Sequence, residues 1–218
     1  MAVICPAVLA AEPHEFREQM QRIAPFAVRV QIDLTDGLFA RTKTISIGHA
    51  WWPHSIPADL HLMYERPDLY LEQILKLKPH MVIVHAEAEG AFVEFAKQLH
   101  DNDIKVGVAL LPETSPDVIT PAMEYIDHVL LFSGDLGHFG GHAELKLLEK
   151  VQKLKQMKPE IEIGWDGGIT DDNAQKLAEA GVDVLNVGGF IQKAANPASA
   201  YAKLVGSIET SHDTKTIT

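Results

Sequence analysis

The sequence predicts a single-domain α/β protein with the (β/α)8 TIM barrel fold, and three observations favour this class. Short apolar runs alternate eight times with longer amphipathic runs, which is typical of parallel strands joined by helices. The chain has 218 residues, a length that eight such units fill. Polar residues and glycine pairs follow the apolar runs, where barrels carry their active sites. An open doubly wound sheet is the alternative, but no GxGxxG turn follows the first run.

The expected strands are the short apolar runs. They lie at residues 3–9, 28–34, 59–63, 81–86, 105–110, 128–132, 160–165 and 184–187. The first run contains Pro6 and follows no basic segment, so we expect a buried strand there and not a signal peptide.

The expected helices are the amphipathic runs between the strands. They lie at residues 13–23, 68–76, 91–100, 116–125, 143–155, 171–180 and 198–208, and the irregular segment 41–57 has room for a short helix only. Gly181 suits the glycine that ends a helix, and Thr170 suits an N-cap followed by Asp171 and Asp172. We therefore expect residues 1–209 to form one barrel domain and residues 210–218 a polar, disordered tail.

Composition and charge restrict the class of protein. Hydrophobic residues make up 46% of the chain and charged residues 22%, which permits a sizeable core and disfavours disorder. The formal net charge of −11 disfavours nucleic acids and anionic membranes as partners. No apolar run approaches the ~18 residues of a membrane span. The one cysteine, Cys5, permits no intrachain disulfide, so we expect a cytoplasmic protein.

Alternation along the strands separates residues that face the helices from residues that face the barrel interior. In the second, third and seventh strands every other residue is apolar, and these apolar residues are expected to face the helices: Val28, Val30, Ile32 and Leu34; Leu60 and Leu62; Ile161, Ile163 and Trp165. The other parity should face inward: Arg29, Gln31 and Asp33; Asp59, His61 and Met63; Glu162, Gly164 and Asp166. In the fourth strand, Ile83, His85 and Glu87 share one face.

Buried carboxylates inside a barrel are costly unless they are paired, hydrated or bound to a metal ion. Asp33, His61, His85 and Asp166 fall at or near the C-terminal ends of four strands. Each alone has a structural explanation, as a core histidine with a partner or as an aspartate that shapes a turn. Their convergence at one mouth of the barrel indicates a catalytic site.

Glycine pairs follow the last three strands and indicate where an anion could bind. They are Gly140 and Gly141, Gly167 and Gly168, and Gly188 and Gly189. Glycine lets backbone N–H groups approach a phosphate closely, and barrels often bind phosphate after strands seven and eight. A tight turn would explain any one pair equally well. Three pairs in succession favour a phosphate site without a basic side chain.

At these residues the sequence resembles the ribulose-phosphate 3-epimerase family, from about residue 3 to residue 205. Residues 59–70 are similar to its third-strand motif, D-x-H-L-M-x-x-x-P-x-x-Y, and residues 31–37 to its second-strand motif, H-x-D-x-M-D-G. Residues 84–87, the pair Gly140 and Gly141, and residues 166–169 also match in order and spacing. Together these motifs are specific to that family, not to barrels in general.

The resemblance implies inversion at C3 of a ketopentose 5-phosphate, ribulose 5-phosphate to xylulose 5-phosphate, in the pentose phosphate part of carbohydrate metabolism. It implies Asp33 and Asp166 as acid and base on opposite faces of the sugar. It implies one divalent metal ion (Zn, Mn or Fe) held by Asp33, His61, Asp166 and the residue at position 31. It also implies a phosphorylated ketose as partner, a homo-oligomer, and a substrate-binding set: Ala7, Met63, His85, Gly140, Gly141, Gly167, Gly168, Gly188 and Gly189.

The sequence departs from the family pattern at four site positions. Gln31 replaces a metal-binding histidine, Ala7 a serine, and Thr35 and Phe132 two methionines. A glutamine carbonyl is a weak ligand for zinc or iron compared with imidazole. Two alternatives to the epimerase therefore remain: a degenerate barrel that binds a phosphosugar without epimerising it, and an enzyme that acts on a different sugar phosphate, for example by decarboxylation.

Overall fold

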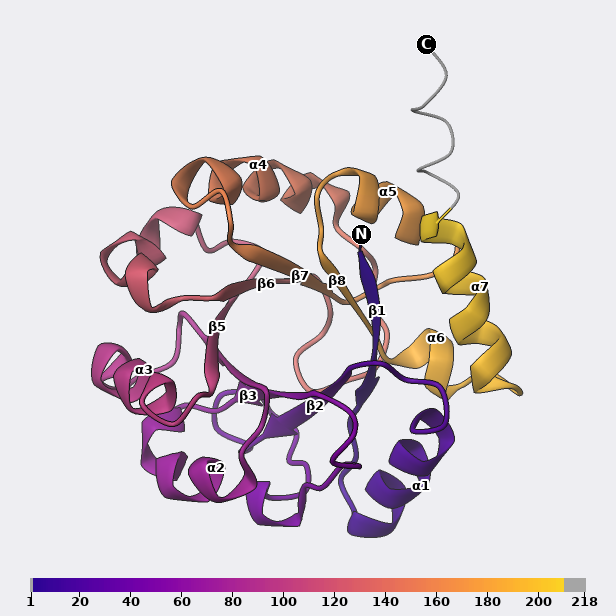
Figure 1. Ribbon diagram of the computed structural model, residues 1–218, viewed down its shortest axis with the longest axis horizontal. Helices are drawn as coiled ribbons and strands as arrows, with labels where there is room; N and C mark the ends of the chain where they lie inside the picture. Colours follow the sequence, from indigo (N-terminus) through magenta and orange to yellow (C-terminus); the bar gives the residue numbers. More distant parts are fainter. Residues whose placement is uncertain (1, 210–218) are drawn as a thin grey trace.

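A computed structural model describes residues 2–209, so the tail predicted at residues 210–218 lies outside the described residues. Eight parallel strands pair in chain order and close into a barrel, with the helices outside them (Figure 1). The strands are β1 (Val3–Val8), β2 (Val30–Thr35), β3 (Ala58–Met63), β4 (Met81–His85), β5 (Lys105–Leu110), β6 (His128–Phe132), β7 (Glu162–Asp166) and β8 (Val184–Val187). The prediction of a single-domain (β/α)8 barrel is confirmed.

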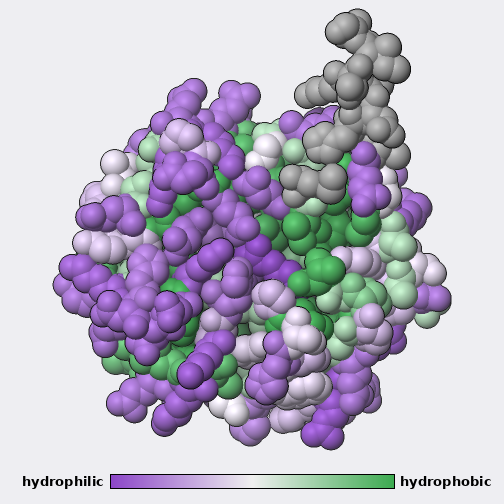
Figure 2. Space-filling model, in the orientation of Figure 1, coloured by the Kyte–Doolittle hydropathy of each residue, from purple (hydrophilic) through white to green (hydrophobic). Residues whose placement is uncertain are grey.

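Each crossover between strands carries at least one helical segment. The helices are α1 (Pro13–Ile23), η1 (Ile47–His49), η2 (Pro67–Tyr70), α2 (Leu71–Leu77), α3 (Phe92–His100), η3 (Pro116–Tyr125), η4 (Leu145–Leu147), α4 (Leu148–Met157), α5 (Ala174–Glu179), α6 (Gly189–Gln192) and α7 (Pro197–Glu209). No helix between residues 2 and 209 has the length and apolar character needed to cross a lipid bilayer. The face seen down the barrel is largely hydrophilic, with smaller apolar areas between the polar residues (Figure 2).

Three local predictions need correction. Residues 116–125 form a 3-10 helix and not an α-helix, and Pro121 inside it cannot donate the backbone hydrogen bond that an α-helix requires. Asn173, not Thr170, is the N-cap of α5, and its Oδ1 accepts a hydrogen bond from the Thr170 backbone N–H. Val28 precedes β2 and is 61% exposed, so it does not face the helix layer. The C-terminal glycine of α5 is confirmed, because Gly181 has φ 99°.

Two separate apolar clusters lie on the two sides of the sheet. The larger cluster joins the outward-facing strand residues, such as Ile32, Leu60 and Trp165, to the helices. The smaller one lies inside the barrel and consists of Met81, Ile83, Ala109 and Leu130, from β4, β5 and β6. The interior is therefore apolar along β4–β6, whereas β2, β3 and β7 contribute polar side chains.

The polar residues at the N-terminal end of the barrel neutralise one another. Arg29 donates to Asp59 at 2.6 Å and to both oxygens of Glu162 at 2.9 Å. His80 and His128 contact the same two carboxylates, at 2.9 and 2.7 Å. Burial opposes ionisation of Glu162, but the hydrogen bonds from His128 and Arg29 outweigh it and lower the pKa of Glu162. These inward charges thus close one end of the barrel and leave the other end for the site.

Replacing Arg29 with Met is expected to lower the free energy of unfolding by about 3–5 kcal/mol, because Asp59 would keep a buried charge without its cation. The side chains of Arg29 and Asp59 are only 10% and 1% exposed. Urea unfolding measures the change. Arg66→Met is the matched control, since it breaks a more exposed arginine–aspartate pair and should destabilise the protein much less. Equal losses in the two variants would contradict the structural role of Arg29.

Candidate functional site

Strand register brings the predicted acid and base residues together at the C-terminal end of the barrel. Asp33 on β2 pairs with His61 on β3, and His61 Nδ1 lies 2.9 Å from Asp33 Oδ1. Asp166 on β7 reaches the same place, with Oδ2 at 3.8 Å from His61 Nδ1. The side chains of Asp33 and Asp166 are 8% and 15% exposed, so both carboxyl groups are largely removed from bulk water.

Gln31 lies between the two carboxylates. Its Nε2 donates to Asp33 Oδ1 at 2.8 Å and to Asp166 Oδ2 at 2.5 Å. Its Oε1 is buried and has no hydrogen-bond partner among the described residues. The residue that departs from the family's metal-binding histidine therefore contacts both predicted catalytic aspartates directly.

The environment of Asp166 raises the affinity of this carboxyl group for a proton. Burial, together with the negative charge of Asp33, raises the pKa of Asp166 above that of an ordinary aspartate. His61 and the hydrogen bond from Gln31 act in the opposite direction but do not compensate. Two carboxylates this close favour a state in which one of them holds a proton. The arrangement can thus present an acid and a base at the same time.

Asp33, His61 and Asp166 form a group that could hold a metal ion. One potential ligand atom from each residue lies within 4.8 Å of the others. Carboxylate oxygen and imidazole nitrogen are ligands for zinc, manganese and iron. These are the three metal ligands that the sequence predicts besides Gln31.

His85 stands behind His61 and not in the open pocket. Its Nε2 lies 3.0 Å from His61 Nε2, and the rings of Phe39 and Phe132 pack against it at centroid distances of 4.7 and 5.8 Å. Burial lowers the pKa of His85 to about 4, so the ring is neutral near pH 7. A direct contact of His85 with substrate stays a prediction, because His85 does not line the pocket described next.

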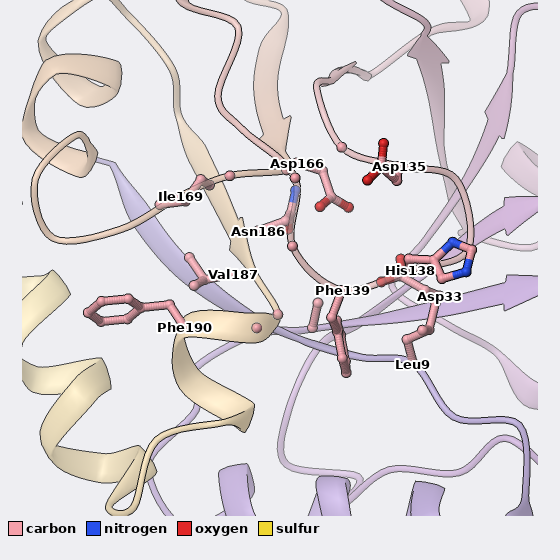
Figure 3. A pocket seen from close by; sticks show the side chains of 18 of the residues that line it. Leu9, Asp33, Asp135, His138, Phe139, Asp166, Ile169, Asn186, Val187 and Phe190 are labelled. Atoms are coloured by element: carbon pink, nitrogen blue, oxygen red, sulfur yellow. The ribbon is translucent and has the colours of Figure 1, made fainter.

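A pocket of about 270 Å³ opens beside Asp33 and Asp166, between β7, β8, the start of α6 and the loop after β6 (Figure 3). Figure 3 shows the Asp166 carboxylate directed into it. The pocket is lined by Ala7, Met63 and Phe132, and by the predicted glycines Gly140, Gly141, Gly167, Gly168, Gly188 and Gly189. The structure therefore brings all the predicted substrate-binding residues except His85 to one cavity.

The glycines of this pocket allow the turns after β6, β7 and β8 to approach one another. A Cβ atom on Gly168 would overlap the backbone of His142 and Ala143, and Gly168 has φ 69°. A Cβ atom on Gly167 would overlap the backbone of Gly134. The Gly168 N–H donates to the Gly140 carbonyl at 3.3 Å. Close packing of loops thus requires these two glycines, whatever they bind.

Lys193 and Asn186 also line the pocket, and the sequence interpretation did not single them out. Lys193 follows Gly189 by one helical turn, with its N–H bonded to the Gly189 carbonyl at 3.0 Å, and this spacing was the available signal. Asn186 pairs with Asp166 across β7 and β8. Its side-chain nitrogen and oxygen are buried without partners among residues 2–209, so strand parity applied to β8 would have found it.

Comparisons with known proteins identify the family of this sequence. The sequence model described as Ribulose-phosphate 3 epimerase family matches residues 3–192. The ribulose-phosphate 3-epimerase of Aquifex aeolicus is 31% identical over 199 residues, which cover 88% of this chain and 90% of the relative. The ribulose-phosphate 3-epimerase of Bacillus subtilis is 29% identical over 217 residues, which cover 95% of this chain and 100% of the relative.

Solved structures with low sequence identity share the fold. KGPDC from Streptococcus mutans matches with a TM-score of 0.75 at 13% identity, over 96% of this chain and 98% of that chain. A 3-hexulose-6-phosphate synthase matches with a TM-score of 0.67 at 18% identity, over 94% of this chain and 99% of that chain. At these identities the likeness supports the barrel alone.

Proposed function

This chain belongs to the ribulose-phosphate 3-epimerase family, and we propose that it inverts C3 of a ketopentose 5-phosphate, converting ribulose 5-phosphate to xylulose 5-phosphate. The observation that carries the proposal is the pair Asp33 and Asp166. Both carboxyl groups reach one pocket from strands separated by β1 and β8, and both contact the same Gln31 amide. Inversion at carbon needs a base on one side and an acid on the other, which this pair supplies.

The protonation of the two carboxyl groups suits the reaction. The raised pKa of Asp166 means that this carboxyl group can hold a proton near neutral pH. The ionised group removes the C3 proton from one face of the sugar, and the protonated group delivers a proton to the other face. In the reverse direction the two roles exchange. In the metal-free structure the Gln31 amide donates to one oxygen of each group.

The donor atoms at this place fit a divalent metal ion. Asp33, His61 and Asp166 supply two oxygens and one nitrogen. The unpartnered Gln31 Oε1 supplies a fourth donor if the amide turns over, because the two ends of a glutamine amide have the same shape. When bound, such an ion stabilises the negative charge of an enediolate. Three oxygen donors with one imidazole are a harder set than the family's two histidines and two aspartates, and oxygen ligands suit manganese.

The phosphate group is proposed to bind at the part of the pocket that is lined by the glycine pairs. Gly188 is the N-cap of α6 and Gly189 its first residue, and backbone N–H groups at such a helix start can face an anion. Lys193, which lines the same cavity, adds a cation. The protein is otherwise acidic, so these groups give the local positive field that an anionic sugar requires. Homo-oligomerisation, a cytoplasmic location, and the absence of nucleic-acid and membrane partners stay predictions.

One observation favours a second candidate, a barrel that binds the phosphosugar without epimerising it. Gln31 Nε2 donates a hydrogen bond to one oxygen of each catalytic carboxylate. In the family pattern a histidine at this position would hold the metal ion instead. If the amide does not turn over, the carboxylates remain paired to Gln31 and no ion stabilises the enediolate.

Metal content and turnover, measured together, test the proposal. Purified protein is expected to hold about one divalent ion per chain, to epimerise ribulose 5-phosphate, and to exchange the C3 proton with deuterated water. Chelation should abolish both activities, and added Mn²⁺ should restore them. Gln31→His is the positive control, because it restores the imidazole of the family pattern. Sugar-phosphate binding without C3 exchange, with and without added metal, would instead identify the non-catalytic barrel.

A further inference from the structure

Asn186 is a polar side chain at a place where the fold requires no polar group. It lies in β8, and its neighbours along the strand, Leu185 and Val187, belong to the apolar cluster outside the sheet. Alternation therefore directs Asn186 toward the barrel interior. There it is only 2% exposed, and its strand partners are Asp166 on β7 and Cys5 on β1.

The amide of Asn186 holds no part of the described structure in place. Between residues 2 and 209, neither its Nδ2 nor its Oδ1 has a hydrogen-bond partner, although Asp166 is its neighbour across the sheet. A buried amide without partners destabilises the folded protein, whereas an apolar side chain of the same shape would be favourable there. The penalty is explained if the amide receives its partner when a ligand binds.

Asn186 lies in the pocket between the two groups that the proposed function uses. It lines the pocket together with Asp166, and Figure 3 shows its side chain next to the Asp166 carboxylate. Two residues further along β8 is Gly188, the N-cap of α6, in the part of the pocket proposed for the phosphate. A sugar phosphate that extends from Asp166 to Gly188 therefore passes Asn186.

The covalent structure of a ketopentose 5-phosphate leaves one group for this amide. C3 lies at the two aspartates and C5 carries the phosphate ester, so C4 is the only carbon between them. The C2 carbonyl and the C1 hydroxyl lie beyond C3, on the side away from the phosphate. The C4 hydroxyl can accept a hydrogen bond from an amide N–H or donate one to an amide oxygen. Both ends of the Asn186 amide are available for such a bond.

We propose that Asn186 is a specificity-determining residue, which binds the C4 hydroxyl group of the sugar phosphate. The inference rests on the proposed function and deepens it, because it names the part of the substrate that β8 recognises. The aspartates hold C3 and the glycine turns hold the phosphate, so an amide on one wall meets a hydroxyl of one C4 configuration. A molecule without that hydroxyl leaves the buried amide without a partner, and it is rejected for this reason.

The dissociation constants of two probes that cannot epimerise, measured by calorimetry, test the inference. Ribitol 5-phosphate has the C4 hydroxyl and the phosphate but no C2 carbonyl, so its C3 proton is not acidic. The second probe is the same polyol phosphate without the C4 hydroxyl. In the wild type, the dissociation constant of this 4-deoxy probe is expected to be about 10- to 100-fold higher. In Asn186→Leu, which keeps the shape without the polar atoms, the two constants should be nearly equal.

A structural role for Asn186 would change both constants by the same factor, so the ratio of the two constants is the decisive readout. Asn186→Leu should also unfold at a higher urea concentration than the wild type, because it removes a buried amide without partners. Asn102→Leu is the matched control. Its exposed amide donates to the Gln98 carbonyl at 2.9 Å, between α3 and β5. This variant should keep the wild-type ratio and gain no stability.

The outcomes separate this inference from the proposed epimerisation. Equal constants for the two probes in the wild type would overturn the inference, whether or not Asn186→Leu folds, and would leave epimerisation intact. An unchanged ratio in folded Asn186→Leu would overturn it as well. The expected ratios in a protein that does not exchange the C3 proton would support the inference and contradict epimerisation. A wild type that binds neither probe would contradict both.

Discussion

Replacing Asp166 with Asn is expected to lower turnover of ribulose 5-phosphate by about 10²–10⁴-fold, the usual contribution of one acid–base group. The amide has nearly the shape of the carboxyl group but cannot accept or deliver the C3 proton. It also removes the group whose pKa is raised by burial and by the charge of Asp33, so the pair no longer has this proton to deliver. Steady-state epimerisation measures the loss, and unfolding curves establish that the barrel persists.

Asp33→Asn should cause a comparable loss in turnover but a different pattern of hydrogen exchange. If the two aspartates serve opposite faces of C3, each single variant retains the base for one epimer only. One variant should then exchange the C3 proton of ribulose 5-phosphate with deuterated water, and the other that of xylulose 5-phosphate. Retention of near-normal turnover in both variants, or loss of exchange from the same epimer in both, would contradict the assignment of one aspartate to each face.

Replacing Gly168 with Ala is expected to destabilise the protein and weaken binding of the sugar phosphate together. Gly168 has φ 69°, and the new methyl group would overlap the backbone of His142 and Ala143. The strained conformation alone costs about 1–3 kcal/mol, and the overlap must displace the loop after β6. That loop supplies Gly140 and Gly141 to the pocket, so its displacement alters the phosphate end. Urea unfolding and ribulose 5-phosphate calorimetry measure the two effects.

Gly206→Ala is the control for this substitution. A methyl group on Gly206 meets nothing within 4 Å, and the residue lies inside α7 on the exposed side. Alanine is favoured over glycine in an exposed helix by about 1 kcal/mol, so this variant should be slightly more stable, with unchanged binding. If Gly168→Ala behaved like Gly206→Ala, the close packing of the turns after β6 and β7 would not be required for the pocket.

The inward positions of Asp33, His61 and Asp166 could be predicted because strand alternation is a local property. The parity of β2, β3 and β7 places Asp33, His61 and Asp166 inward, and the barrel rule places their strand ends at one mouth. The structure agrees, with one ligand atom from each residue within 4.8 Å of the others. The glycine pairs could also be recognised in the sequence, because glycine after a strand indicates a turn whose backbone conformation is unfavourable for other residues.

Other features of the site depend on contacts between residues far apart in the chain. The hydrogen bonds from Gln31 to Asp33 and Asp166 join β2 to β7. The sequence alone shows that a histidine of the family pattern is missing at position 31, but it does not show that the glutamine donates to both aspartates. Asn186 enters the site because β8 closes the barrel between β7 and β1. Asn173, and not Thr170, is the N-cap of α5, and its side chain bonds the Thr170 N–H and the Gly168 carbonyl.

The sequence by itself determined the barrel, the inward position of the two aspartates and the family, because alternation, glycine placement and motif spacing are properties of short segments. Only the tertiary structure decided which atoms meet: that Gln31 donates to both aspartates, that Lys193 lines the pocket, and that Glu87 lies beside His85. These contacts depend on barrel closure and on side-chain direction, and both arise from packing across the whole molecule.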